Sequence, residues 1–272
     1  MSEPAQSSPE WSRLKVVPRD DMSSRTPGHD EPKSQHKASI RVARDLANYI
    51  CDHQLPEGTR LPAEQQMQSI FGVGRTTLRE ALRVLELRGI IVIRSGRGGG
   101  PVVRQPQTTD MREALALILQ FRYATLADVI GARILLEPKI AAAAAWRISK
   151  EDLGALRETV EIMLDDVTDE VSFSEQYNRF HSVLADAVDN SVVAVLVDSL
   201  HFVDVGRWDL EFRPQIIARV ARAHLEIIEA LQTGDANLAE AAMRLHLVDA
   251  KTYYARNFPE AFSTPLRWLE GE

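Results

Sequence analysis

Residues 61–89 read LPAEQQMQSIFGVGRTTLREALRVLELRG, and this stretch decides the fold of the N-terminal part of the chain. Pro62 suits the first position of a helix, which we predict over residues 63–70. A short turn that contains glycine follows. The next helix is predicted over residues 75–88, where Gly89 ends it. Two helices joined by so short a turn predict a helix-turn-helix.

The sequence on either side completes a winged helix-turn-helix. A first helix is predicted upstream because apolar residues recur there at helical spacing, namely Val42, Leu46, Tyr49 and Ile50. Downstream, residues 90–94 and 101–104 form two short runs rich in β-branched residues around a glycine-rich tip. This pattern is typical of a β-hairpin, which here would be the wing.

The second helix of the motif has a face suited to DNA. Arg75, Arg79 and Arg83 share one arc at about 100° per residue, with leucines on the opposite side. Thr76 borders this arc. Arginine bridges guanine O6 and N7 or clamps phosphate, and threonine contacts phosphate or the thymine methyl group. The alternative is a solvated basic face with ion pairs such as Arg79 or Arg83 with Glu86.

The charge of the chain is unevenly distributed. Residues 37–104 carry eleven Lys or Arg and six Asp or Glu, a net charge of +5, whereas the whole chain carries −7. A basic module on an acidic body indicates that one part binds a polyanion. The sequence has no run of 18 apolar residues and no apolar N-terminal segment, so we expect a cytoplasmic protein without a membrane partner. The single cysteine, Cys51, excludes an intramolecular disulfide, and we expect it in the core.

Five segments are expected along the chain. Residues 1–36 are polar and rich in Ser and Pro, so we expect a disordered tail. The winged helix-turn-helix occupies residues 37–104, and residues 105–110 form a polar linker. Residues 111–258 have an almost unbroken helical pattern, so the fold class is mainly α. A proline then ends the last helix and leaves residues 259–272 as a C-terminal tail.

The N-terminal motif resembles the GntR family of bacterial regulators. The resemblance rests on the LPAE segment at residues 61–64, on GVGRTTLREAL at residues 72–82, and on the glycine-rich wing. It implies that operator DNA is contacted by Arg75, Thr76, Thr77 and Arg79 and, at the wing, by Ser95 and Gly96. The basic arc and the basic wing add Arg83 and Arg97 to this set.

Two positions depart from the GntR pattern. Gly74 stands where the family usually has Ser or Thr, so one phosphate-binding or capping hydroxyl is missing. Gln65 occupies a position that is arginine in some relatives. Gln65 is therefore a further DNA-binding candidate, and the sequence leaves its base preference open.

The helical region resembles the FCD effector domain, which places the chain in the FadR subfamily of GntR regulators. The matching residues are LADV at 126–129, Arg133, Leu136-Glu137, the alanine run at 141–145, Phe180-His181, His224 and His246. The resemblance implies an antiparallel all-α bundle, a homodimer, and a small carboxylate effector bound near a divalent metal.

The histidines support a metal site independently. His224 and His246 lie at nearly equal distances on either side of a predicted helix–helix turn at Gly234. In an antiparallel pair both would lie at the same height, ~15 Å from the turn. His181 on another helix would complete three imidazole ligands for zinc or nickel. The alternative is three histidines with purely structural roles.

Tyr177 stands four residues before His181, where relatives carry Asp or Asn. A phenol is a poor ligand for a divalent ion, so we expect Tyr177 to line an effector site instead. Arg133 has two interpretations, an effector carboxylate anchor or a structural i,i+4 ion pair with Glu137.

The sequence thus predicts a ligand-responsive DNA-binding repressor that binds a pseudo-palindromic double-stranded operator as a homodimer. Two alternatives remain for the helical region. One is a dimerisation module without metal or effector. The other is a metal-dependent hydrolase built on the three histidines, although no HExxH motif occurs.

Overall fold

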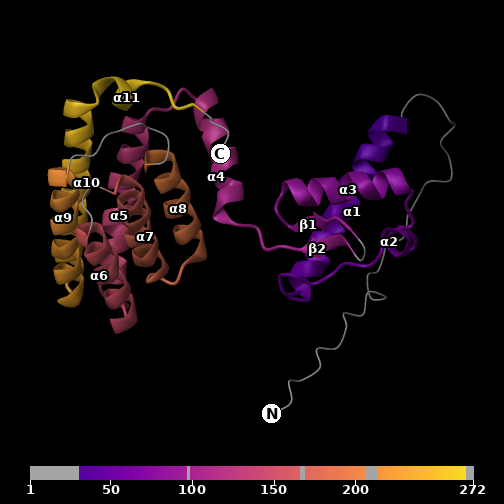
Figure 1. Ribbon diagram of the computed structural model, residues 1–272, viewed down its shortest axis with the longest axis horizontal. Coiled ribbons are helices and arrows are strands. Elements are labelled where there is room, and N and C mark those ends of the chain that lie inside the picture. Colours follow the sequence, from indigo (N-terminus) through magenta and orange to yellow (C-terminus); the bar gives the residue numbers. More distant parts are fainter. Residues whose placement is uncertain (1–30, 97–98, 166–168, 206–213, 268–272) are drawn as a thin grey trace, which may run out of the picture. The chain divides into compact units, whose positions relative to one another are not determined.

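The structure is a computed structural model that describes residues 31–96, 99–165, 169–205 and 214–267. The chain divides after Asp110 into two compact units (Figure 1). The regular secondary structure of the described residues consists of helices and one β-hairpin, so the predicted fold class is confirmed. Three predictions lie outside the described residues, namely the disorder of residues 1–30, the tail at residues 268–272, and DNA binding by Arg97.

The N-terminal unit contains three helices followed by the hairpin. Their bounds are α1 Glu31–Asp52, α2 Glu64–Phe71, α3 Arg75–Leu87, β1 Ile91–Arg94 and β2 Gly100–Val103. The strands pair antiparallel, with Ile91 opposite Val103 and Arg94 opposite Gly100. This order of elements is the predicted winged helix-turn-helix.

One apolar core holds these elements together. It includes the residues that recur at helical spacing on α1 and α3, among them Val42, Leu46, Leu78, Leu82 and Leu85. Gly72 ends α2 with a φ of +61°, a conformation that glycine adopts without steric cost. The chain therefore turns sharply into α3, and the exposed face of α3 is fixed by the burial of its leucines.

Helix α1 begins at Glu31, six residues before the predicted start of the ordered region. His36 approaches Glu80 on α3, with 3.0 Å between Nδ1 and Oε1. The hydroxyl of Ser39 donates to the carbonyl oxygen of His36 at 2.8 Å. Contact with α3 thus extends the helix into a segment whose polar composition indicated disorder.

The C-terminal unit is helical throughout its described residues. Its helices are α4 Thr108–Phe121, α5 Leu126–Ala144, α6 Lys150–Asp165, α7 Glu170–Asp186, α8 Ser191–Val205, α9 Pro214–Gln232, α10 Ala236–Asn257 and α11 Pro259–Ser263. α5 packs along α10, and α6 packs against both α7 and α9. From the alanine run at the end of α5, Ala141, Ala144 and Ala145 lie in the core, where small side chains permit close helix packing. Among the described helices, none combines the length and the hydropathy needed to span a bilayer.

Side-chain caps fix where several of these helices begin. Thr125 and Asp128 form a reciprocal capping box at the start of α5. Asp235 caps α10 by accepting the backbone N–H groups of Asn237 and Leu238. Gly234 precedes this cap with a φ of +72°. The α9–α10 turn expected from the sequence is therefore present, and it sets the register between the two helices that carry His224 and His246.

The structure corrects three expectations. α4 begins at Thr108, so half of the expected linker is helical, and Asp110 accepts the backbone N–H of Gln107 at 2.8 Å. The expected tail includes α11, after which Leu266 is buried and donates its backbone N–H to Ala124 at 2.8 Å. Cys51 is exposed rather than buried, because it lies on the solvent face of α1.

Candidate DNA-binding face and histidine cluster

The exposed face of α3 carries the side chains expected to contact DNA. Arg75, Thr76, Arg79 and Arg83 are exposed, and Thr77 is half-buried. The opposite face lies in the core through Leu78, Ala81, Leu82 and Leu85. The structure therefore presents the basic arc to solvent, as the periodicity predicted.

Glu64, at the start of α2, lies beside this basic arc. Its carboxylate accepts from Arg79 Nε at 3.1 Å and lies 3.8 Å from Arg75 Nε. Glu86 was the partner considered from the sequence for Arg79 or Arg83. In the structure, its carboxylate accepts the backbone N–H of Ile93 instead. Since Glu64 engages only Nε, the two terminal nitrogens of Arg79 can still form the bidentate contact that a guanine requires.

The other DNA-binding candidates lie at the ends of neighbouring elements. Gln65 is exposed on α2, and Ser95 and Gly96 are exposed at the hairpin tip, where Gly96 has a φ of +95°. Gly74 occupies the N-cap of α3 in an extended conformation without a side-chain cap. The first turn of α3 therefore has no hydroxyl cap, as the sequence indicated.

The second candidate site is a buried cluster of histidines in the C-terminal unit. His181 lies on α7, His224 on α9 and His246 on α10, and all three are at least 96% buried. One nitrogen of each lies within 4.8 Å of a nitrogen of the other two. The consecutive helices α9 and α10 and the more distant helix α7 thus bring the predicted imidazole ligands together.

Glu137 on α5 and His201 on α8 extend this cluster. Glu137 Oε2 is 2.6 Å from His181 Nδ1, and Glu137 Oε1 is 3.0 Å from His201 Nε2. A carboxylate next to Nδ1 holds a proton on that nitrogen and leaves Nε2 as the ligand atom. His201 was not predicted, since a single histidine on an apolar helix leaves no periodic pattern in the sequence.

Arg133 and Tyr177 complete a buried polar network around Glu137. Arg133 is fully buried; its Nε donates to Glu137 Oε1 at 2.7 Å and its Nη2 donates to Tyr177 Oη at 2.8 Å. Of the two interpretations from the sequence, the structural ion pair is present. A direct contact between Arg133 and an effector carboxylate stays a prediction.

Burial keeps the clustered histidines neutral. Desolvation lowers the pKa of His181 to about 3, although the Glu137 carboxylate opposes this shift. Burial also holds the pKa values of His224 and His246 well below the usual range, helped by neighbouring histidines. The pKa of Glu137 is held well below its usual range by the charge of Arg133 and by His181, against the effect of burial. The cluster therefore contains imidazoles with free lone pairs at neutral pH.

Several of these nitrogens lack hydrogen-bond partners within the described part of the chain. They are His181 Nε2, both ring nitrogens of His224, and His246 Nε2. An unsatisfied buried polar atom costs about 1–3 kcal/mol. A divalent metal bound by three imidazoles would use such lone pairs, so the donor set fits zinc or nickel.

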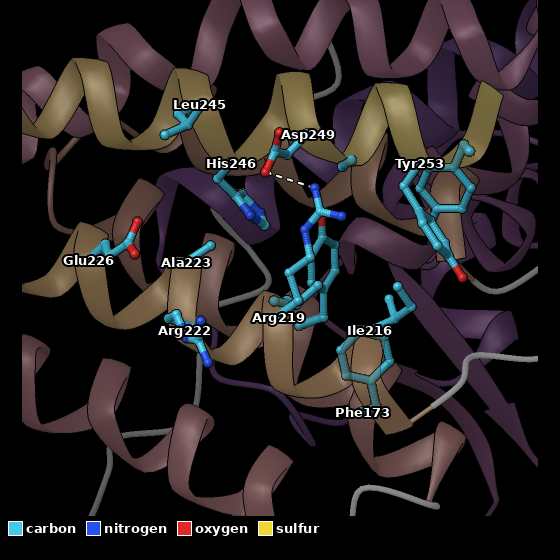
Figure 2. A pocket seen from close by; sticks show the side chains of 14 residues that line it. Phe173, Ile216, Arg219, Arg222, Ala223, Glu226, Leu245, His246, Asp249 and Tyr253 are labelled. Carbon is cyan, nitrogen blue, oxygen red and sulfur yellow. Dashed lines mark hydrogen bonds and ion pairs between the residues drawn. The ribbon is translucent and has the colours of Figure 1, made fainter. Parts of the chain in front are cut away.

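A pocket opens beside the cluster, between α9 and α10. Its volume is about 290 Å³, and Tyr177 and His246 form part of its wall. Figure 2 shows Arg219 reaching from α9 toward Asp249 on α10, where Nη2 and Oδ2 are 2.8 Å apart. The pocket thus connects solvent with one of the three candidate metal ligands.

A winged helix-turn-helix with an exposed basic helix, joined to a helical unit with a buried histidine cluster, defines a DNA-binding regulator. Two family models agree. Residues 38–99 match the bacterial regulatory proteins of the gntR family, and residues 128–249 match the FCD domain. Together these matches span more than half of the 272 residues. The chain belongs to the GntR family and carries an FCD domain, the architecture of the FadR subfamily.

Matches to similar proteins cover most of the chain. The HTH-type transcriptional repressor NanR of Salmonella arizonae is 27% identical over 236 residues, which cover 82% of this chain and 87% of that protein. NanR of Salmonella typhimurium is 27% identical over 227 residues, with coverages of 79% and 84%. The solved structure of Streptococcus agalactiae GntR matches with a TM-score of 0.62 at 27% identity, covering 79% of this chain and 99% of that one. These relatives are transcription regulators and not enzymes, which agrees with the expectation from the sequence.

Proposed function

We propose that the protein is a ligand-responsive transcriptional repressor that binds operator DNA through α3 and the wing. The assignment as a repressor is supported by the names of the NanR relatives. We place its action in the cytoplasm on a pseudo-palindromic double-stranded operator. One α3 reads only a few base pairs, so useful specificity requires two half-sites and a homodimer.

Exposed apolar side chains in the C-terminal unit support the homodimer. Ile118 and Phe121 on α4 are 58% and 74% exposed, and Leu135 on α5 is 75% exposed. Contiguous exposed apolar patches are typical of surfaces that associate, and these side chains are candidates for such a surface. Burial of these side chains between two copies would join two α3 helices into one DNA-binding unit.

The observation that carries the sensing function is the group of unpartnered imidazole nitrogens on His181, His224 and His246. These three residues would hold a divalent metal, zinc or nickel. A bound metal would supply positive charge and open coordination positions for a carboxylate. Glu137 would hold His181 in the tautomer with Nε2 free, and Tyr177, anchored by Arg133, would close one side of the site.

Zinc titration of the full-length protein tests this assignment. We expect one zinc ion per chain and loss of most of the bound zinc when His224 is replaced by Ala, with far-UV helicity retained. His53→Ala, an exposed histidine in the N-terminal unit, is the matched control and should bind zinc like the wild type. Equal zinc affinity in wild type and His224→Ala would rule out the histidine cluster as the metal site.

A second titration tests the link between sensing and DNA binding. An operator is first selected from random double-stranded DNA with the purified protein. We expect a carboxylate effector to change the operator affinity of the zinc-loaded wild type but not of His224→Ala. A helical unit that serves only dimerisation would leave operator affinity unchanged by every carboxylate in both proteins.

A further inference from the structure

The wall of the α9–α10 pocket is mostly apolar. Its apolar and aromatic side chains include Phe173, Ile216, Val220, Ala223, Ala250 and Tyr253. Figure 2 shows Phe173 and Tyr253 toward one end of the groove and Glu226 toward the other, with His246 between them. The pocket therefore has an aromatic end that adjoins a candidate metal ligand.

The charged side chains of the pocket balance one another. Arg219 is paired with Asp249 across the groove, and Arg222 and Glu226 lie on the same helix. Two cations are thus matched by two carboxylates. No surplus of positive charge in the lining is available for a ligand that carries several negative charges.

The size of the pocket limits the ligand further. Its volume of about 290 Å³ lies near the lower end of small-molecule sites, which are ~300–1,000 Å³. It is roughly twice the ~150 Å³ of a cavity that accepts benzene. One ring with a short acidic side chain fits this space, whereas a larger cofactor does not.

A single negative charge has a defined place beside the pocket. His246 lines the wall, and its Nε2 has no hydrogen-bond partner among the described residues. The carboxylate nearest to the cluster, Glu137, is already engaged by Arg133 and by two histidines. A dication held by neutral imidazoles would therefore lack a carboxylate ligand from the described chain, and a ligand carboxylate would supply it.

We infer that the α9–α10 pocket binds a small monocarboxylate with an aromatic or branched apolar body, its carboxylate at His246 and its body toward Phe173 and Tyr253. This inference rests on the proposed sensing function and names the ligand class of that site. A di- or tricarboxylate binds more weakly, because its additional charges lose hydration against a mostly apolar wall whose two arginines are balanced in number by two carboxylates.

Calorimetry on the full-length, zinc-loaded protein tests the ligand class. The probes are 3-phenylpropionate, its uncharged amide, succinate and propane-1,2,3-tricarboxylate. Burial of the phenyl ring favours 3-phenylpropionate over succinate by at least about tenfold in dissociation constant. The amide, which lacks the charge, is also expected to bind at least about tenfold more weakly than the acid.

Two matched substitutions on α10 test the location. Ala250 lines the pocket, whereas Ala255 is exposed on the same helix. Ala250→Phe fills the pocket and is expected to weaken 3-phenylpropionate binding by at least about tenfold while leaving zinc affinity unchanged. Ala255→Phe adds the same bulk outside the pocket and is expected to bind like the wild type.

The possible outcomes separate the inference from the proposed function. Equal or tighter binding of the polyacids overturns the ligand class and leaves carboxylate sensing intact. Wild-type affinity in a folded Ala250→Phe overturns the location. If Ala250→Phe does not fold, the wild-type ligand series alone decides the ligand class. If no carboxylate binds the zinc-loaded protein, the sensing function fails and the inference fails with it.

Discussion

At the scale of single residues, one buried carboxylate organises the C-terminal site. Glu137 contacts Arg133, His181 and His201 and thereby balances the charge of the buried guanidinium. Tyr177 fills the remaining space with a phenol that accepts a hydrogen bond from Arg133. Outside these contacts, both ring nitrogens of His224 and Nε2 of His246 have no hydrogen-bond partner among the described residues.

Substitution of Tyr177 should separate its structural role from metal binding. Tyr177→Asp places a carboxylate one helical turn from His181 and is expected to tighten zinc binding several-fold. Tyr177→Phe provides no ligand and should leave zinc affinity unchanged. Both variants remove the phenol that Arg133 bonds, so each should lose about 1–3 kcal/mol of unfolding free energy. Zinc calorimetry and urea unfolding measure the two effects, and weaker zinc binding in Tyr177→Asp would contradict this placement.

Arg79 is the residue on which DNA recognition should depend most. Its Nε is held by Glu64, which leaves the terminal nitrogens for a guanine. Arg79→Ala is expected to lose about 1–3 kcal/mol of binding free energy and to relax discrimination at one base pair in each half-site. Anisotropy titration of the selected operator measures this loss. As a control, Arg256→Ala removes an equal charge from an exposed position on α10 and should bind operator normally. An unchanged operator affinity in Arg79→Ala would rule out the placement of α3 against the DNA.

At the scale of elements, the sequence predicts those features that depend on local patterns but not those that depend on packing between distant helices. The winged helix-turn-helix follows from helical spacing, a glycine turn and a β-branched hairpin, all of which act within a few residues. The α9–α10 pairing follows from the turn at Gly234 and the equal spacing of two histidines. The positions of His201, of the pocket and of Leu266 depend on packing between distant helices, which leaves no periodic pattern in the sequence.

The convergence of α7, α9 and α10 makes stability depend on pH. The clustered histidines have pKa values below 6.5 when folded, with His181 at about 3, and about 6.5 when unfolded. Above pH 6.5 these histidines are neutral in both states, and the stability of the folded protein is at its full value. As the pH falls below 6.5 this stability is lost, because only the unfolded chain takes up protons. Each histidine should reduce the unfolding free energy by about 1.4 kcal/mol per pH unit.

Metal-free wild type and His224→Phe are the pair that tests this pH dependence. The substitution keeps an aromatic ring next to Phe180, which stacks on His224 at 3.8 Å, and removes one titrating group. Urea unfolding between pH 6.5 and 4.5 should show a shallower loss of stability in His224→Phe. Parallel curves for the two proteins would mean that His224 is protonated in the folded state.

At the scale of the whole molecule, we propose that the N-terminal unit recognises DNA and the C-terminal unit senses the ligand. The N-terminal unit presents the basic helix, and the C-terminal unit contains the histidines, the pocket and the exposed apolar side chains of α4. We expect the selected operator to be an inverted repeat occupied by two chains, since protein symmetry is mirrored in the DNA. Sedimentation of the complex measures the stoichiometry, and one chain per operator would exclude the two-fold arrangement.

We propose that a ligand at the histidine cluster controls DNA binding by α3. The most direct test is the anisotropy of labelled operator bound to full-length protein, titrated with 3-phenylpropionate with and without one equivalent of zinc. We predict that operator affinity changes with the acid only when zinc is present, and that His224→Ala abolishes the change. An operator affinity that is the same with or without the acid and with or without zinc, in wild type and variant alike, would exclude control of DNA binding by a ligand at the histidine cluster.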